Sequence, residues 1–270
     1  MKRILSVLSL VTLLLLSSCN KEDPKGSISS FNAIIEDYSE VFTWNNGDAI
    51  CVSNGSSVSD FTFDDSAGLF MADNAMSASD HLQAIYPASS AEWEGKCFRV
   101  IVPEKQVATQ NGDVSIPMFL WRQSEDGYRF RSLYGKVIIS INGSGTALYD
   151  AALSEVVFTS TGNPACGIAT VSKDGTLSFS QGSQTLTIEC GEGMNVHTPI
   201  VFLLPCHKYP MGSKVTFKFA DGKTIESETI MGIVPRRGMT KAYGIEVTAD
   251  FFGPLEEYED GGSLDNNYSE

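Results

Sequence analysis

Three histidines and a serine turn are the first residues of this chain to consider for catalysis or metal binding. His81, His197 and His207 lie far apart, and none belongs to an HExxH or HxH pair. Zinc sites use cysteine and histidine at short spacings, which this sequence lacks. Gly143-Ser144-Gly145 has the wrong flanks for a hydrolase elbow, and no phosphate-binding glycine loop is found. The sequence therefore predicts no catalytic residue, no metal and no cofactor.

Two acidic clusters are further candidates. Glu92 and Glu94 flank Trp93, which could place two carboxylates beside a ring that stacks on sugars. Alternate residues of a strand point to the same side, so the pair is also typical of a solvated face, which we favour. Asp64-Asp65 and Asp113 could bind calcium, but no loop has the ligand spacing of a known calcium site. We expect no enzyme.

Aromatic residues give a weaker hypothesis of ligand binding. Trp44, Trp93 and Trp121, with nine tyrosines, could form stacking surfaces for glycans. In a β-sandwich most such residues fill the core, and we expect the core for these as well.

The first 19 residues have the pattern of an export signal. Lys2 and Arg3 precede an apolar run over 4–16, shorter than the roughly 20 residues that span a bilayer as a helix. The charged start, apolar middle and small residues at the end are typical of a cleavable signal peptide. Leu16-Ser17-Ser18-Cys19 matches the lipobox of bacterial lipoproteins, in which the cysteine is acylated and becomes the N-terminus. We expect a signal peptide over 1–18 and lipidation at Cys19; an ordinary secretory signal with a chance cysteine is the alternative.

A short polar tether over 19–27 follows the expected anchor. Asn20-Lys21-Glu22-Asp23 resembles an export tag of surface lipoproteins in some gram-negative anaerobes, and by composition alone is a solvated linker. We expect the protein to be anchored by lipid in the outer membrane and exposed at the cell surface.

The net charge of the chain limits the classes of partner that it could bind. The chain has a formal net charge of −14, which becomes near −16 once Lys2 and Arg3 leave with the signal. Such a charge argues against nucleic acid as a partner.

The cysteines after Cys19 are odd in number and form no CxxC motif. They are Cys51, Cys97, Cys166, Cys190 and Cys206. One pair, such as Cys190 with Cys206, could form a disulfide, but buried free thiols are the favoured interpretation.

Hydrophobicity alternates with a period of two along most of the chain, which predicts an all-β protein. Two Asp-Gly dipeptides, at 221–222 and 174–175, lie between alternating runs and predict tight hairpins. Continuous apolar runs over 137–141 and 200–204 predict strands buried on both faces. Only 66–82 and 147–153 could hold short helical turns.

Strand-like segments at regular spacing suggest β-sandwiches in tandem. We expect one over 28–121, a second over 122–252, and a disordered acidic tail over 253–270.

The last strand of the second sandwich is unusually long. From 239 to 251 one face carries Met239, Tyr243, Ile245, Val247 and Phe251, with Lys241 as a charged exception. Strands average about 5–6 residues. This segment either closes its own sheet or is offered to another molecule by strand addition.

Several segments in this order resemble the fimbrillin-like proteins, the subunits of type V pili and their surface-lipoprotein relatives. The resemblance covers most of residues 30–250 and is carried by short motifs. They are the lipobox at Cys19, Phe31–Glu36, Trp44–Val52, Ala84–Pro87, Val102–Gln106, Ile116–Met118 and Phe130–Val137. Within them, Asp48 is expected to bond backbone amides, and Pro87 and Pro103 to end strands.

The resemblance implies two transthyretin-like sandwiches and assembly with other pilus subunits by donor-strand exchange. In polymerising members a protease cuts after a basic residue and releases an N-terminal strand. Here Lys21 and Lys25 precede the first expected strand, and the first later arginine, Arg99, lies inside one. That departure favours an accessory subunit, such as an anchor or tip, that supports adhesion to a host glycan or protein. The alternative is a monomeric surface lipoprotein that binds a glycan or a protein.

Overall fold

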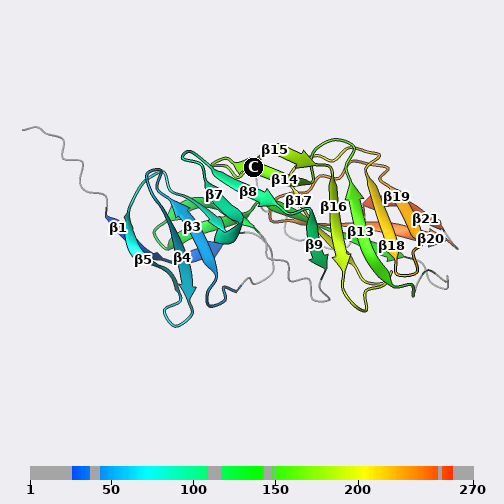
Figure 1. Cartoon of the computed structure of the whole chain (residues 1–270), viewed down its shortest axis with the longest axis horizontal. Helices are drawn as coiled ribbons and strands as arrows, with labels where there is room; N and C mark the ends of the chain where they lie inside the picture. The colour runs from blue at the N-terminus through cyan, green and yellow to red at the C-terminus, as the bar shows by residue number, and fades with distance from the viewer. Residues whose placement is uncertain are drawn as a thin grey trace, which may run out of the picture.

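The computed structural model describes residues 26–36, 43–108, 117–142, 148, 150–248 and 251–257. These residues form twenty-one β-strands and one short 3-10 helix over Ala88–Ser90, with no α-helix among them. The all-β prediction is confirmed. The molecule is elongated, with β1 and β3–β5 at one end, β13, β16 and β18–β21 at the other, and β7, β8, β14 and β15 between them (Figure 1).

The first sheet has eight strands. In spatial order they are β1 (Ser27–Phe31), β5 (Leu69–Ser77), β4 (Val58–Asp64), β3 (Ala49–Ser53), β6 (Gln83–Tyr86), β10 (Met118–Ser124), β11 (Gly127–Ser132) and β2 (Ala33–Ile35). Strand β5 occupies the middle of 66–82, so the expectation of a helical turn is wrong for that part of the segment.

Three further sheets contain the remaining strands. The five-stranded sheet has the order β19 (Thr224–Glu228), β18 (Lys214–Phe219), β13 (Leu153–Thr159), β16 (Thr185–Cys190) and β9 (Lys105–Ala108). The β12 sheet has the order β17 (Ile200–Pro205), β12 (Tyr134–Asn142), β20 (Thr240–Thr248) and β21 (Phe251–Glu257). The β14 sheet has the order β15 (Leu177–Ser183), β14 (Cys166–Val171), β8 (Phe98–Val102) and β7 (Ala91–Trp93).

The local predictions of turns and strand ends are confirmed. Strands β14 and β15 pair around Asp174-Gly175, and β18 and β19 pair around Asp221-Gly222. Both glycines have positive φ, as such turns require. Strand β6 ends before Pro87 and β8 before Pro103. Asp48 accepts a hydrogen bond from the Asn45 amide at 2.8 Å.

The two apolar runs pair with each other but differ in burial. Strand β17 is buried at all but one position, whereas β12 alternates between buried and half-buried residues. The continuous run in β12 therefore does not mean complete burial of both faces.

Two hydrophobic cores share one layer of strands. Strands β3, β6 and β10 turn Ile50, Ala84 and Leu120 toward a core inside the eight-stranded sheet. From the same three strands, Cys51, Ile85 and Phe119 belong to the second core, which also contains residues of the other three sheets. Successive side chains of a strand point to opposite faces, so a strand apolar throughout can serve both cores.

The strand order does not follow the expected division of the chain. The boundary between residues 121 and 122 falls inside β10, and β7–β9 pair with each other or with strands after residue 150. The number and limits of domains stay a prediction. Residues 253–257, expected in the acidic tail, instead lie in β21, because Phe252 and Leu255 are buried beside β20.

The side chain of Gln106 joins the edges of two sheets. Gln106, on β9, is only 6% exposed. Its Nε2 donates to the Leu203 carbonyl on β17 at 2.9 Å, and the Leu203 amide donates to its Oε1 at 3.1 Å. The carboxamide thus pairs both backbone groups of a strand edge that is buried away from water.

Replacing Gln106 by leucine should destabilise the protein, because both backbone groups of Leu203 lose their partner in a buried place. We expect a loss of about 1–3 kcal/mol in the free energy of unfolding, measured by urea denaturation. Gln181→Leu, at an exposed position of β15, is the matched control. Equal midpoints for the two variants would contradict the role given to Gln106.

Candidate functional site

The expected lipid anchor lies outside the described residues. Cys19, the signal peptide and most of the tether belong to 1–25, so lipidation stays a prediction. Asp113 and the Gly143-Ser144-Gly145 turn also fall outside. In the part of the chain that the structure describes, no helix has the length and apolar character needed to cross a bilayer.

The N-terminal segment closes the eight-stranded sheet. Strand β1 pairs with β5 at one edge, and β2 pairs with β11 in parallel at the other edge. Only Asn32 separates the two strands, and its neighbours Phe31 and Ala33 are buried in the core. The Asn32 carbonyl accepts from the Tyr128 amide at 2.8 Å. One continuous segment therefore covers two edges that would otherwise be open.

The position of basic residues bears on how this segment could be released. Between Gly26 and Glu94 the sequence has no lysine or arginine, and Lys96 comes only after β7. Arg99 lies inside β8, as expected. A protease that cuts after basic residues thus has no site between β2 and β3.

The candidate intersubunit strand lies inside a sheet of its own chain. Strand β20 pairs in parallel with β12 and antiparallel with β21. Tyr243, Ile245 and Val247 are 1%, 0% and 6% exposed. Met239 precedes the strand and is 37% exposed, and Phe251 begins β21 opposite Thr248. The single strand expected over 239–252 is therefore a hairpin, and donation of β20 would require it to leave both neighbours.

The candidate histidines and carboxylates lie in separate places of the described structure. The Nε2 of His197 lies 3.1 Å from Asp150 Oδ1, and burial lowers the pKa of His207. Arg99 Nη1 lies 3.1 Å from Glu92 Oε2, and Arg99 Nε lies 3.8 Å from Glu94 Oε1, so one arginine forms ion pairs with both carboxylates. The described residues contain no group of three or more His, Cys, Asp and Glu that could hold a metal ion.

Two of the three tryptophans pack in the cores, and the third does not. Trp44 donates from Nε1 to the Ala33 carbonyl at 2.9 Å and packs edge-on against Phe70. Trp93 packs against Phe98 at 5.0 Å. Trp121 is 38% exposed on β10, so the expectation of a core position is wrong for this residue.

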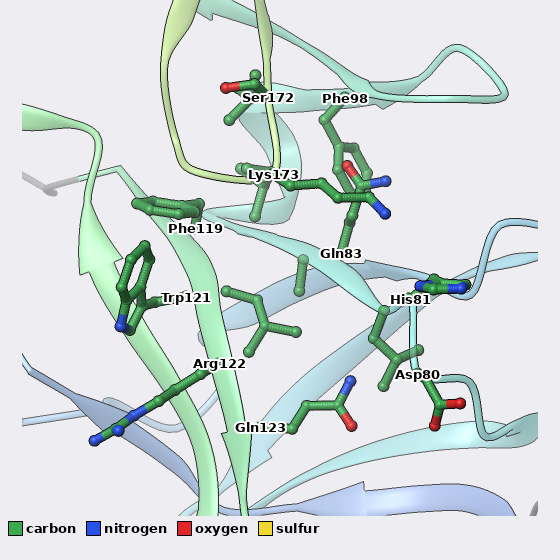
Figure 2. A pocket seen from close by; sticks show the side chains of 15 residues that line it. Asp80, His81, Gln83, Phe98, Phe119, Trp121, Arg122, Gln123, Ser172 and Lys173 are labelled. Atoms are coloured by element: carbon green, nitrogen blue, oxygen red, sulfur yellow. The ribbon is translucent and has the colours of Figure 1, made fainter.

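Trp121 lines a pocket of about 370 Å3 between the eight-stranded sheet and the β14 sheet (Figure 2). Other lining residues come from the start of β6, from β8 and from the β14–β15 turn. The sequence singles out Trp121 and His81 but gives no sign that Gln83, Phe119 and Lys173 lie beside them. Strand β10 is buried over Met118–Leu120 and exposed over 121–123. The sequence marks this change locally, because an apolar run ends there in Trp-Arg-Gln.

None of the five described cysteines forms a disulfide. The alternative of a disulfide between Cys190 and Cys206 is therefore wrong. The favoured interpretation of buried thiols holds for Cys51 and Cys166, whereas Cys97, Cys190 and Cys206 are only partly buried. Burial, with a smaller contribution from the nearby Asp60, raises the pKa of Cys51 to about 12. Burial also raises the pKa of Cys190 to about 11.

Comparison with known proteins identifies the fold. No family model and no curated protein matches the chain. A candidate cell adhesion protein from Bacteroides ovatus is 11% identical, with a TM-score of 0.60 over 87% of this chain and 97% of its own. Another from Bacteroides uniformis is 16% identical, with a TM-score of 0.57 over 85% of this chain and 97% of its own. The chain has the fold of these two cell adhesion proteins.

Neither of these two proteins is described as an enzyme. A fimbrilin from Porphyromonas gingivalis is 9% identical over 86% of this chain and 92% of its own. Its TM-score against this chain is 0.43.

Ile245→Asp should unfold the monomer, because it places a carboxylate at a fully buried position between β12 and β21. Ala242→Asp is the matched control, because it introduces the same carboxylate at an exposed position of β20. Circular dichroism and a thermal melt of the two variants provide the measurement. A folded Ile245→Asp monomer would mean that β20 is dispensable for its own sheet.

The raised pKa values of Cys51 and Cys190 predict slow alkylation of both thiols. At pH 8 the thiolate is the reactive form, and pKa values near 12 and 11 leave only about 10⁻⁴ of Cys51 and 10⁻³ of Cys190 ionised. We expect iodoacetamide to label both slowly in the native protein, with rates that rise about tenfold per pH unit. Mass spectrometry with a sample in urea as the control measures this. Equally fast labelling in both samples would contradict the burial of these thiols.

Proposed function

We propose that this chain is a surface lipoprotein that serves as an accessory subunit of a fimbrium, at its anchor or its tip, and supports adhesion. The fold that it shares with two candidate cell adhesion proteins supports a place at the cell surface. The ordered fimbrillin-like motifs support the fimbrial part of the proposal, and the lipobox at Cys19 supports attachment to the outer membrane.

The strongest support for an accessory role is that the chain completes its own sheets at both ends. Its first strands occupy both edges of the eight-stranded sheet, and its last strands form a hairpin beside β12. A repeating stalk subunit needs an open groove and a strand to donate. The lack of a basic residue between β2 and β3 gives a protease of that specificity no means to open such a groove.

The alternative is a monomeric lipoprotein that binds a ligand at the cell surface. The pocket beside Trp121 favours it, because an exposed tryptophan in a hollow suits recognition better than packing.

Electrophoresis of whole cells separates the two functions. Joints formed by strand exchange bury a ladder of backbone hydrogen bonds and open slowly, so they survive cold detergent. For a fimbrial subunit we expect an immunoblot to show high-mass bands in unboiled samples that collapse to one band on boiling.

Cys19→Ser tests the anchor in the same cells. The variant should leave the membrane fraction, whereas wild-type chain stays in it. A single monomer band in boiled and unboiled wild-type samples would contradict assembly, and an unchanged membrane fraction for Cys19→Ser would contradict lipidation.

A further inference from the structure

The pocket lies between the eight-stranded sheet and the β14 sheet and has two chemically different sides. Figure 2 shows Phe119 and Trp121 on one side and Asp80 and His81 on the opposite side, with Lys173 extending from the β14–β15 turn. Its volume of about 370 Å3 falls within the range of about 300–1,000 Å3 that is usual for small-molecule sites.

Trp121 points to the pocket because it follows Phe119 by two residues on β10, and alternate side chains of a strand lie on the same face. The pairing of β10 with β11 shifts between Leu120 and Arg122, so that Trp121 has no partner in the ladder. The guanidinium of Arg131 lies 4.2 Å from the centre of the indole ring, and Glu36 Oε2 lies 3.6 Å from Arg131 Nε. The ring is therefore held in place while 38% of the residue remains exposed.

Phe119 is fixed beside Trp121 by the neighbouring hairpin. Its ring centre lies 6.3 Å from that of Trp121, nearly at right angles. Arg237 lies 4.9 Å from the ring centre, and a side chain at Gly175 would collide with the ring. Phe119 is only 2% exposed, so it supports Trp121 from the core, and Trp121 supplies the exposed apolar surface, of the kind that packs against the C–H face of a sugar ring.

Lys173 supplies a cation from a turn of defined shape. The next residue, Asp174, accepts hydrogen bonds from the Thr176 amide at 3.2 Å and from the Thr176 hydroxyl at 3.0 Å. Its own carbonyl accepts from Arg237 Nη1 at 2.8 Å. No residue of the described part of the chain forms an ion pair with Lys173. Its ammonium is therefore a positive charge in the pocket with which an anionic group of a ligand can pair.

Three further lining residues, Gln83, Gln123 and Asp80, have side chains that can bond hydroxyls. Gln83 donates from Nε2 to the Lys96 carbonyl at 3.2 Å, which orients its amide. Gln123 donates from Nε2 to the Ser79 carbonyl at 3.4 Å. The carboxylate of Asp80 completes this side of the pocket.

We propose that this pocket binds a sugar ring that carries a carboxylate, such as a uronic acid. The ring packs against Trp121, and the carboxylate pairs with Lys173. The hydroxyls bond to Asp80 and to the two glutamines. This assignment is independent of whether the chain assembles into a fimbrium.

An amino acid is the main competing ligand, because its carboxylate and ammonium could pair with Lys173 and Asp80. A sugar acid suits the pocket better, since two carboxamides and a carboxylate can bond several hydroxyls at once. An amino acid has no hydroxyls to bond the remaining donor hydrogens and the acceptor oxygens of these carboxamides.

Two methyl glycosides that differ only at C6 test the proposal with the full chain in detergent. Saturation-transfer NMR and titration calorimetry should detect methyl glucuronide and find methyl glucoside about tenfold weaker, the effect of one charge-assisted hydrogen bond. Lys173→Met should remove this preference, and Lys173→Arg should keep it. Trp121→Ala should weaken both glycosides about tenfold, because stacking is lost for both.

Lys208→Met is the matched control, since Lys208 is exposed and lies outside the pocket lining. Thermal melts verify that each variant is folded. Equal binding of the two glycosides by the wild type, or no binding of either, would overturn the proposal. Tighter binding of phenylalanine than of methyl glucuronide would assign the pocket to amino acids.

Discussion

The burial of Ile50–Val52 on β3, Ala84–Tyr86 on β6 and Met118–Leu120 on β10 is the constraint on which the rest of this structure depends. Even-numbered residues of these segments, such as Ile50, pack inside the eight-stranded sheet, and odd-numbered ones, such as Ile85, pack against the other sheets. A single layer therefore holds two cores together. A polar substitution in these segments would disturb a core whichever way it pointed. The pocket beside Trp121 lies at the margin of the same layer, where the two sheets separate.

The chain also uses its own ends and one side chain to cover strand edges. Exposed edges present unpaired backbone groups that favour association with other chains. Strands β1 and β2 cover both ends of the eight-stranded sheet, and Gln106 bonds the edge of β17. On the opposite side Leu255 of β21 forms a bridge with Thr229, and Ser227 donates to the Gly253 carbonyl at 2.7 Å. The described part of the molecule is thus largely complete without a second copy.

Local features of this fold could be predicted from the sequence, whereas its long-range pairings could not. Asp-Gly turns such as 174–175 depend on two residues, so the hairpins follow from the sequence directly. The pairing of β8 with β14 joins segments about 70 residues apart, and nothing in either segment specifies its partner. The candidate site could not be predicted either, because its residues come from distant segments. The sequence indicates that Trp121 could bind sugars, but its exposure depends on where β10 leaves the core, and its companion Lys173 lies on a distant turn.

The continuity of β1 and β2 has a mechanical consequence. A pulling force applied at Gly26 reaches β1 first and loads its bonds to β5. Only after these bonds break does the force pass through Asn32 to β2 and its bonds to β11, at the other edge of the sheet. The two ladders therefore resist tension one after the other. A chain held at its N-terminus against flow would yield in two stages, with the first stage leaving β2 still bound in the sheet.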